Sequence, residues 1–184
     1  MTSQVSSMIQ PDSPIVVRPE SDGDADGIRR VLVAAFEGET EADLVEALRK
    51  NRALVVSLVA CTDREIVGHV SFSPMHADGQ PDRDDTLGLA PLSVHPQWQR
   101  RGLGSSLIQC GLDECRKRAV GTIFVLGAPE FYGRFGFVPA HTRGLRSVFK
   151  APPDAFQMLV LRDNALVRSL AGLVHYRPEF DSFL

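Results

Sequence analysis

The sequence feature that most restricts the fold is a β-strand pattern that runs through a glycine-containing turn into a long amphipathic helix and then a second strand. The first apolar run is Leu87–Val94, and apolar residues at helical spacing extend from Leu103 to Val120. Gly121 should end this helix before the strand Thr122–Leu126. Two strands joined through a helix run parallel in a sheet. The sequence therefore predicts an α/β fold.

The segments on either side of this unit predict one mixed central sheet flanked by helices. Runs of β-branched residues favour strands, and apolar residues at helical spacing favour helices. We expect the further strands at 15–18, 54–60, 66–72, 135–138 and, as the last one, 156–161, and the further helices at 25–36, from 40, and near 129. Pro91 cannot donate a backbone hydrogen bond, so the strand that contains it should be bulged or unpaired on one side.

Length and composition fit one domain of ordinary size. The chain has 184 residues, of which 43% are hydrophobic, enough to bury a full core. Residues 1–13 are polar and lack periodicity, so we expect a flexible N-terminal arm before a single domain at 14–184. A C-terminal extension should begin near residue 162 and end in an extended segment at 175–180. Docking of this extension on its own domain or across a homodimer is predicted by an apolar helical face at Leu166, Val167, Leu170 and Val174.

Charge and cysteine content argue against several classes of protein. A formal net charge of -3, with Lys and Arg scattered along the chain, is atypical of nucleic-acid-binding domains. Cys61, Cys110 and Cys115 lack CxxC spacing, so we expect neither a disulfide framework nor a metal site, and a cytoplasmic location. No signal-peptide pattern and no membrane-spanning apolar run of about 18 residues is present in the sequence, so we expect no membrane partner.

The turn before the long helix has the composition of an anion site. Residues 99–106 read Gln-Arg-Arg-Gly-Leu-Gly-Ser-Ser. The first N–H groups of a helix lack intrahelical partners, and Gly102 and Gly104 would let a phosphate approach without meeting a Cβ atom. A GxGxxG motif would need glycine at Leu107, and a P-loop would need Gly-Lys-Ser/Thr, so both are excluded. The alternative is that the glycines only permit tight packing of helix on strand.

The segment Gln99–Gly104, which follows Val94-His95-Pro96, resembles the Gln/Arg-x-x-Gly-x-Gly/Ala signature of the GNAT N-acetyltransferase superfamily. The resemblance implies a sheet whose middle strands splay, here at Pro91, and no metal. It also implies that acetyl-CoA binds with its pyrophosphate on the turn and its pantetheine arm along the preceding strand. The implied cofactor-binding residues are Leu92, Ser93, Val94, Gln99, Arg100, Arg101, Gly102, Leu103, Gly104, Ser105 and Ser106.

A second motif, Phe131–Phe137, resembles the family's tyrosine four residues before Gly-Phe. With it, the resemblance extends over about Ile15–Leu161. The sequence departs from the family at 126–129, Leu-Gly-Ala-Pro, where many relatives carry an asparagine that contacts the pantetheine.

Acetyl transfer needs a neutral amine, a hydrogen-bond donor to the oxyanion, and a proton for the leaving thiolate. We expect the Val94 amide to be the donor and Tyr132, protonated at pH 7, to be the acid; packing alone is the alternative role for Tyr132. The base is left open by the sequence. Candidates that border the implied acceptor cleft, but that also suit a helix N-terminus, are Glu37, Glu39 and Glu41. Weaker candidates are Glu130, His76 and His95.

The predicted function is transfer of acetyl from acetyl-CoA to a primary amine by direct attack on the thioester. The acceptor stays open among a small amine, an amino sugar, a protein N-terminus and a lysine. Two further functions are a non-catalytic acyl-CoA sensor that regulates a partner and a transferase for a bulkier acyl group.

Overall fold

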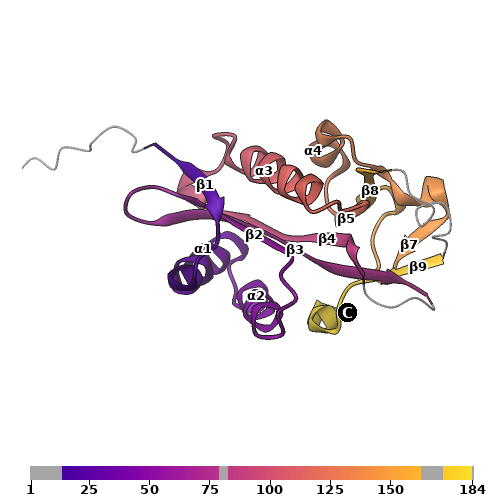
Figure 1. Cartoon of the computed structure of the whole chain (residues 1–184), viewed down its shortest axis with the longest axis horizontal. Coiled ribbons are helices and arrows are strands. Elements are labelled where there is room, and N and C mark those ends of the chain that lie inside the picture. The colour runs from indigo at the N-terminus through magenta and orange to yellow at the C-terminus, as the bar shows by residue number, and fades with distance from the viewer. Residues whose placement is uncertain (1–13, 79–82, 163–171, 184) are drawn as a thin grey trace, which may run out of the picture.

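The computed structural model describes residues 14–78, 83–162 and 172–183, so the expected arm at 1–13 lies outside the described residues. Its centre is a nine-stranded sheet in the order β1-β2-β3-β4-β5-β8-β6, with β9 pairing β3 and β7 (Figure 1). The strands are β1 (Val16–Pro19), β2 (Val56–Cys61), β3 (Ile66–Ala77), β4 (Arg83–Val94), β5 (Thr122–Leu126), β6 (Val138–Pro139), β7 (Leu145–Ser147), β8 (Phe156–Val160) and β9 (Gly172–His175).

Helices cover both faces of this sheet. On one face lie α1 (Ala25–Phe36) and α2 (Thr40–Lys50), and on the other lie α3 (Leu103–Lys117) and α4 (Pro129–Tyr132) (Figure 1). The described residues also form six 3-10 segments: η1 (Asp22–Asp24), η2 (Pro96–Trp98), η3 (Gly133–Phe135), η4 (Ala140–Arg143), η5 (Pro153–Ala155) and η6 (Pro178–Phe183). None of the helices in the described ranges is long and apolar enough to cross a membrane.

The middle of the sheet splays as expected. β4 and β5 run parallel but pair only from Thr86 to Gly88, and beyond that point β4 pairs with β3 alone. The register of β3 against β4 shifts between Val70, opposite Leu92, and Phe72, opposite Leu89. Two residues of β4, one of them Pro91, therefore face one residue of β3. The predicted parallel crossover and the predicted bulge at Pro91 are both confirmed.

Three predictions about chain ends and breaks are wrong. The helix α3 ends at Lys117 instead of near Gly121, because Ala119 already takes the left-handed conformation with φ of 59°. The strand β8 is not the last one: Val174, expected on a helix, lies in β9, which pairs His76 and Ala77 of β3. The segment expected to be extended at 175–180 instead enters η6 at residue 178. The other residues of the expected apolar helical face, Leu166, Val167 and Leu170, lie outside the described residues.

The described part of the C-terminal extension packs on its own domain. Tyr176 and Phe180 are buried among side chains of α2, β3, β5 and β8. A Cβ atom at Gly88 would lie 2.7 Å from Cε1 of Tyr176. The tyrosine ring can therefore pack against β4 here only because residue 88 has no side chain.

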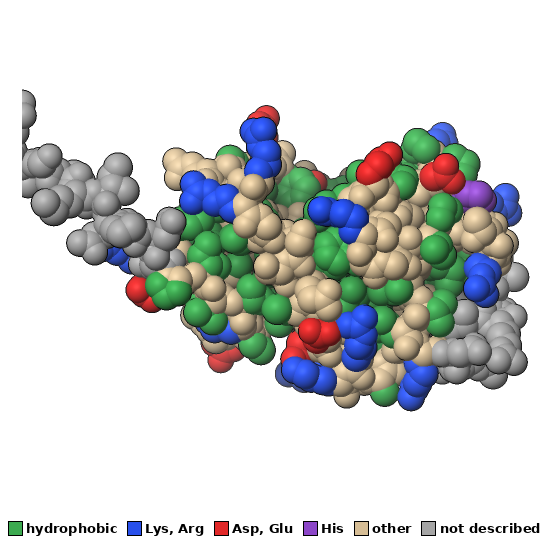
Figure 2. All heavy atoms as spheres, turned by 90° about the horizontal axis from the view of Figure 1, so that it is seen from above, with side chains coloured by type: hydrophobic (Ala, Val, Ile, Leu, Met, Phe, Trp, Pro, Cys, Tyr) green, Lys and Arg blue, Asp and Glu red, His purple; other side chains and the backbone are tan. Residues whose placement is uncertain are grey.

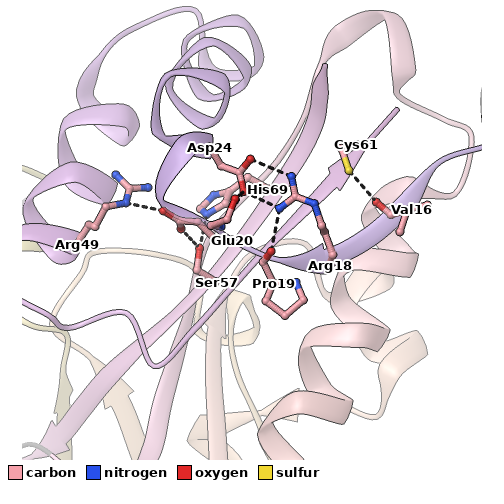
Figure 3. Close-up of polar contacts among 10 residues, drawn as sticks. Val16, Arg18, Pro19, Glu20, Asp24, Arg49, Ser57, Cys61 and His69 are labelled. Atoms are coloured by element: carbon pink, nitrogen blue, oxygen red, sulfur yellow. Dashed lines mark hydrogen bonds and ion pairs between the residues drawn. The ribbon is translucent and has the colours of Figure 1, made fainter. Parts of the chain in front are cut away.

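A chain of buried and half-buried polar groups joins β1, β2, β3 and α2 (Figure 3). Nε of Arg49 donates to Oε1 of Glu20 at 2.6 Å, and the hydroxyl of Ser57 donates to Oε2 of the same carboxylate. His69 is fully buried, with Nε2 2.9 Å from Oγ of Ser57. Because the Ser57 proton goes to Glu20, Nε2 of a neutral His69 is the donor to Ser57. Burial first, and Arg49 second, lower the pKa of His69 to about 3.

Candidate active site

The start of α3 offers unpaired backbone donors. The first hydrogen bond within the helix runs from the N–H of Ser106 to the carbonyl of Gly102, 3.0 Å away, and no side chain caps the helix at Gly102. The N–H groups of Leu103, Gly104 and Ser105 precede that bond and have no partner inside the helix. Together with the positive end of the helix dipole they form an anion site.

Gly102 and Gly104 differ in why a side chain is absent at each position. Gly102 takes φ of +84°, a conformation that side chains other than glycine rarely adopt. Gly104 has an ordinary helical position, and a Cβ atom there would meet nothing nearer than Cζ of Phe131 at 3.7 Å. Packing of α3 on the sheet therefore does not require glycine at 104. The missing side chain leaves open space directly in front of the helix.

That space is a cavity of about 460 Å³, the turn cavity. Its walls are Leu92, Val94, Trp98, Gln99, Arg100, Gly102, Leu103, Gly104, Ser105, Phe131 and Arg134. Eight of the residues expected to bind the cofactor from sequence are among them. Three others, Ser93, Arg101 and Ser106, are outside the wall.

The side chains of those three residues are engaged elsewhere. Ser93 is buried on the other side of β4, where its hydroxyl donates to the carbonyl of His69 at 3.5 Å. The guanidinium of Arg101 lies 5.1 Å from the centre of the Trp98 ring. The Ser106 hydroxyl donates to the carbonyl of Gly102 at 3.4 Å. Of these three, Ser93 can still contact a cofactor through its backbone, since β4 continues past the cavity.

The amide of Val94 points toward the open edge of β4. Successive N–H groups of an extended strand point to opposite sides, and the N–H of His95 donates to Val67 of β3 at 2.9 Å. The N–H of Val94 therefore faces away from β3, toward the side from which β5 has diverged. The carbonyl of Val94 accepts a hydrogen bond from Nε2 of Gln99 at 3.0 Å, which ties the strand end to the turn.

A second cavity of about 720 Å³, the splay cavity, lies where β4 and β5 separate, and Leu92 lines both cavities. The bulged residues Leu89–Leu92 form one wall, and Leu126 and Tyr132 stand beside them. The remaining wall is Phe36, Glu41, Leu44, Val148, Phe149, Lys150, Phe180 and Phe183.

Tyr132 lies between the two cavities in an aromatic cluster. Its ring centre is 5.0 Å from that of Phe131, which lines the turn cavity, and 5.9 Å from that of Phe137. Burial raises the pKa of Tyr132 to about 12, so the phenol stays protonated at neutral pH. Within the described ranges its hydroxyl makes no hydrogen bond to another protein group, which leaves the proton available to a ligand.

Of the candidate bases, only Glu41 lines a cavity. Glu39 is paired with Arg29 at 3.1 Å on the surface of α1 and α2, and Nδ1 of His95 accepts a hydrogen bond from the Gln97 amide at 3.4 Å. His76 stacks on His175 with ring centres 5.1 Å apart. The side chains of the two remaining candidates, Glu37 and Glu130, line neither cavity, and nor does that of His76.

Sequence reasoning missed Trp98, Phe131 and Arg134 as walls of the turn cavity. The guanidinium of Arg134 lies 4.7 Å from the centre of the Phe131 ring, which brings a positive charge to the cavity from the second motif. The signal was present, because Arg134 stands inside the motif that contains Tyr132. On the face drawn in Figure 2, Lys and Arg side chains lie scattered between apolar ones instead of forming one basic surface.

The uncapped helix start, the splayed parallel strand pair and Tyr132 all lie within residues 25–137, which the sequence model of the acetyltransferase (GNAT) family matches. The chain belongs to this family. It is 36% identical over 170 residues to the N-acetyltransferase YhbS of Escherichia coli strain K12, a match that covers 92% of this chain and all of that protein.

Solved structures agree with this membership. YhbS from Escherichia coli in complex with CoA superposes with a TM-score of 0.86 at 35% identity, covering 95% of this chain and 96% of that one. A GNAT acetyltransferase from Brucella melitensis in complex with acetyl-CoA gives a TM-score of 0.76 at 34% identity, covering 92% and 100%. The expected family and fold class are thus confirmed.

Proposed function

We propose that this chain is an acetyl-CoA-dependent N-acetyltransferase that moves the acetyl group to a primary amine by direct attack on the thioester. Membership of the acetyltransferase family gives the reaction class, and relatives solved with CoA or acetyl-CoA support the co-substrate. The observation that carries the site is the uncapped start of α3, which opens into a cavity that meets a second cavity at Leu92.

The turn cavity fits the pyrophosphate of CoA. The N–H groups of residues 103–105 supply donors. Arg100 of the turn and Arg134 of the second motif add positive charge. The pantetheine arm would then run along the open edge of β4 at Leu92–Val94, where no strand of the described residues pairs. In this arrangement the thioester reaches the splay cavity.

The proposed chemistry uses the groups that lie where the turn cavity and the splay cavity meet. The neutral amine attacks the thioester carbonyl, and the N–H of Val94 donates to the oxyanion that forms. The C–S bond then breaks as the amide is completed. The thiolate takes a proton from Tyr132, and the phenol is restored by the proton that the new amide nitrogen loses.

The acceptor arrives as an ammonium ion and must lose one proton before attack. Glu41 is the base candidate that lines the splay cavity, and water in the open cavity mouth can also take the proton. Acetyl-CoA is used inside cells, and Cys61, Cys110 and Cys115 are free thiols, so we also propose a cytoplasmic location. Burial of Tyr176 and Phe180 supports our proposal that 14–184 is one domain with a docked C-terminal extension.

The test is a pair of measurements on the full chain. CoA and acetyl-CoA should each raise the melting temperature, because a ligand of the native state stabilises it by mass action. With an amine panel, release of free thiol should accompany an acetylated product detected by mass. Binding of CoA without transfer to any amine would favour the acyl-CoA sensor instead.

A further inference from the structure

The side chains that line the splay cavity are mostly apolar, although the site must receive an amine. Apart from Glu41, Tyr132 and Lys150, every side chain that lines it is apolar, and four of them are the phenylalanines Phe36, Phe149, Phe180 and Phe183. A volume of about 720 Å³ is within the range of small-molecule sites. A small, strongly hydrated amine would leave most of this wall without a partner.

The same cavity collects apolar side chains that are exposed. Phe36, Leu126 and Phe183 are 41%, 37% and 38% exposed, and they are three of the six large hydrophobic side chains so exposed in the described ranges. All three line the splay cavity. Clustered exposure of this kind marks a binding site, because scattered single residues would be expected otherwise.

Two opposite charges complete the wall. Glu41 at the start of α2 and Lys150 after β7 both line the cavity, yet neither makes a hydrogen bond or ion pair with any residue that the structure describes. A charged group beside apolar surface is stabilised when a ligand supplies the opposite charge and forms a charge-assisted hydrogen bond with it. The carboxylate suits an ammonium group, and the ammonium of Lys150 suits a carboxylate.

From this combination we propose that the acceptor is a zwitterionic amine with a large apolar side chain, that is, a hydrophobic α-amino acid. The inference rests on the proposed acetyltransferase function and adds the substrate class. The apolar body lies against the phenylalanine wall, the amine is drawn in by Glu41, and the carboxylate pairs with Lys150. A polyamine would place a second positive charge against Lys150, and a bulkier acyl chain would leave both charges without a partner.

The reaction is balanced without a further co-reactant. The ammonium group loses one proton to solvent, and its nitrogen forms the C–N bond to the acetyl carbon as the C–S bond breaks. The second proton is transferred to the thiolate. The products are an N-acetyl amino acid, CoA with a free thiol, and one proton.

The test compares three acceptors on the wild-type chain: free phenylalanine, 2-phenylethylamine, which lacks the carboxylate, and spermidine. Acetyl-CoA consumption is followed by thiol release and product mass. Phenylalanine should give the highest kcat/KM, 2-phenylethylamine a value about twofold to fivefold lower, the range for loss of one partly exposed ion pair, and spermidine the lowest.

Lys150→Gln isolates the carboxylate contact. It should lower kcat/KM for phenylalanine about twofold to fivefold and leave that for 2-phenylethylamine unchanged, so the preference between them disappears. Glu41→Gln should raise KM for both acceptors, because both carry the ammonium group. Lys50→Gln is the matched control, since Lys50 is an exposed lysine of α2 outside both cavities.

The outcomes separate this inference from the proposed function. Efficient transfer to spermidine with none to phenylalanine would overturn the amino-acid assignment and keep the acetyltransferase. An undiminished preference for phenylalanine in Lys150→Gln would equally overturn the assignment. Higher activity with a bulky acyl-CoA than with acetyl-CoA would mean that the apolar wall binds the acyl chain of the donor and not the acceptor. Absence of CoA binding would overturn both proposals.

Discussion

The ring of Tyr132 lies against the backbone of Gly127 so closely that a Cβ atom at Gly127 would stand 2.4 Å from Cε2 of the ring. Gly127 is the residue after β5, in the segment where the sequence departs from its family. Glycine at this position therefore has a packing reason, because any side chain would displace the tyrosine.

We predict that Gly127→Ala lowers kcat by about 10-fold or more, since the methyl group must push the ring of Tyr132 out of position. CoA binding, measured by thermal shift, should change little. Gly133→Ala is the matched control: Gly133 follows Tyr132 directly, has φ of -55°, and has nothing within 4 Å of its added Cβ atom. Equal kcat in the two variants would show that the exact placement of the ring is unimportant.

Tyr132→Phe tests the hydroxyl alone. The ring still fills its space, so folding and acetyl-CoA affinity should be preserved while kcat falls about 100-fold, the low end for loss of a positioned acid. Because burial raises the pKa of Tyr132 to about 12, ionisation of this phenol should cause no loss of wild-type rate below pH 10. Unchanged kcat in the variant, with chemistry shown to be rate-limiting, would leave Tyr132 only a packing role.

Gly104→Asp should abolish the CoA-dependent rise in melting temperature, because its carboxylate would occupy the space in front of the helix and repel the pyrophosphate. The protein without ligand should keep its melting temperature, since an acidic side chain in the first turn of α3 is favoured by the helix dipole. Gly104→Ala serves as the uncharged control, as its Cβ atom has room at 3.7 Å from Phe131. A normal shift with CoA in Gly104→Asp would exclude the turn cavity as the pyrophosphate site.

His69 should make the fold less stable as the pH falls. Its pKa in the folded protein is about 3, below the ordinary value of 6.5, so between these values the unfolded chain binds a proton that the native protein does not. Stability from this group is complete above pH 6.5, and about 2 kcal/mol should be lost between pH 7 and pH 5. In urea titrations at both pH values, the free energy of unfolding of His69→Gln should fall between pH 7 and pH 5 by about 2 kcal/mol less than that of the wild type. Equal decreases in both proteins would show that His69 is not the group responsible.

The two phenylalanines of η6 should differ in how much they contribute to stability. Phe180→Ala should lower the free energy of unfolding by about 3 kcal/mol, because Phe180 is only 5% exposed in the core. Phe183→Ala should cost less than about 1 kcal/mol, since that ring is 38% exposed at the splay cavity. Urea unfolding of both variants gives the comparison, and equal losses would mean that η6 is not docked as described.

The parts of the fold that depend on neighbouring residues were predictable from the sequence. The helix Ala25–Phe36 and the strand Thr122–Leu126 are found with the expected bounds, because each has a clear apolar period and a glycine or polar break beside it. The strand β9 was missed because its partners, β3 and β7, are distant in sequence and its four residues are too short for a period.

The same distinction applies to the two cavities. The turn cavity is built from residues 92–105 and from the second motif, so two local patterns were enough to find most of it. Arg101 was expected in its wall, but its guanidinium lies over the Trp98 ring, a contact that no sequence spacing reveals. The splay cavity brings together six separate stretches of chain, and only the folded structure shows that Glu41 and Lys150 share it.

The final 3-10 segment, Pro178–Phe183, forms part of the wall of the splay cavity and none of the turn cavity. Under the acceptor site proposed above, evolution can alter which molecules are modified by replacing exposed residues of this segment, while the turn cavity stays unchanged. An enzyme engineer has the same freedom. Libraries confined to the exposed positions of this last segment would diversify the choice of acceptor while every member inherits one unchanged cofactor site.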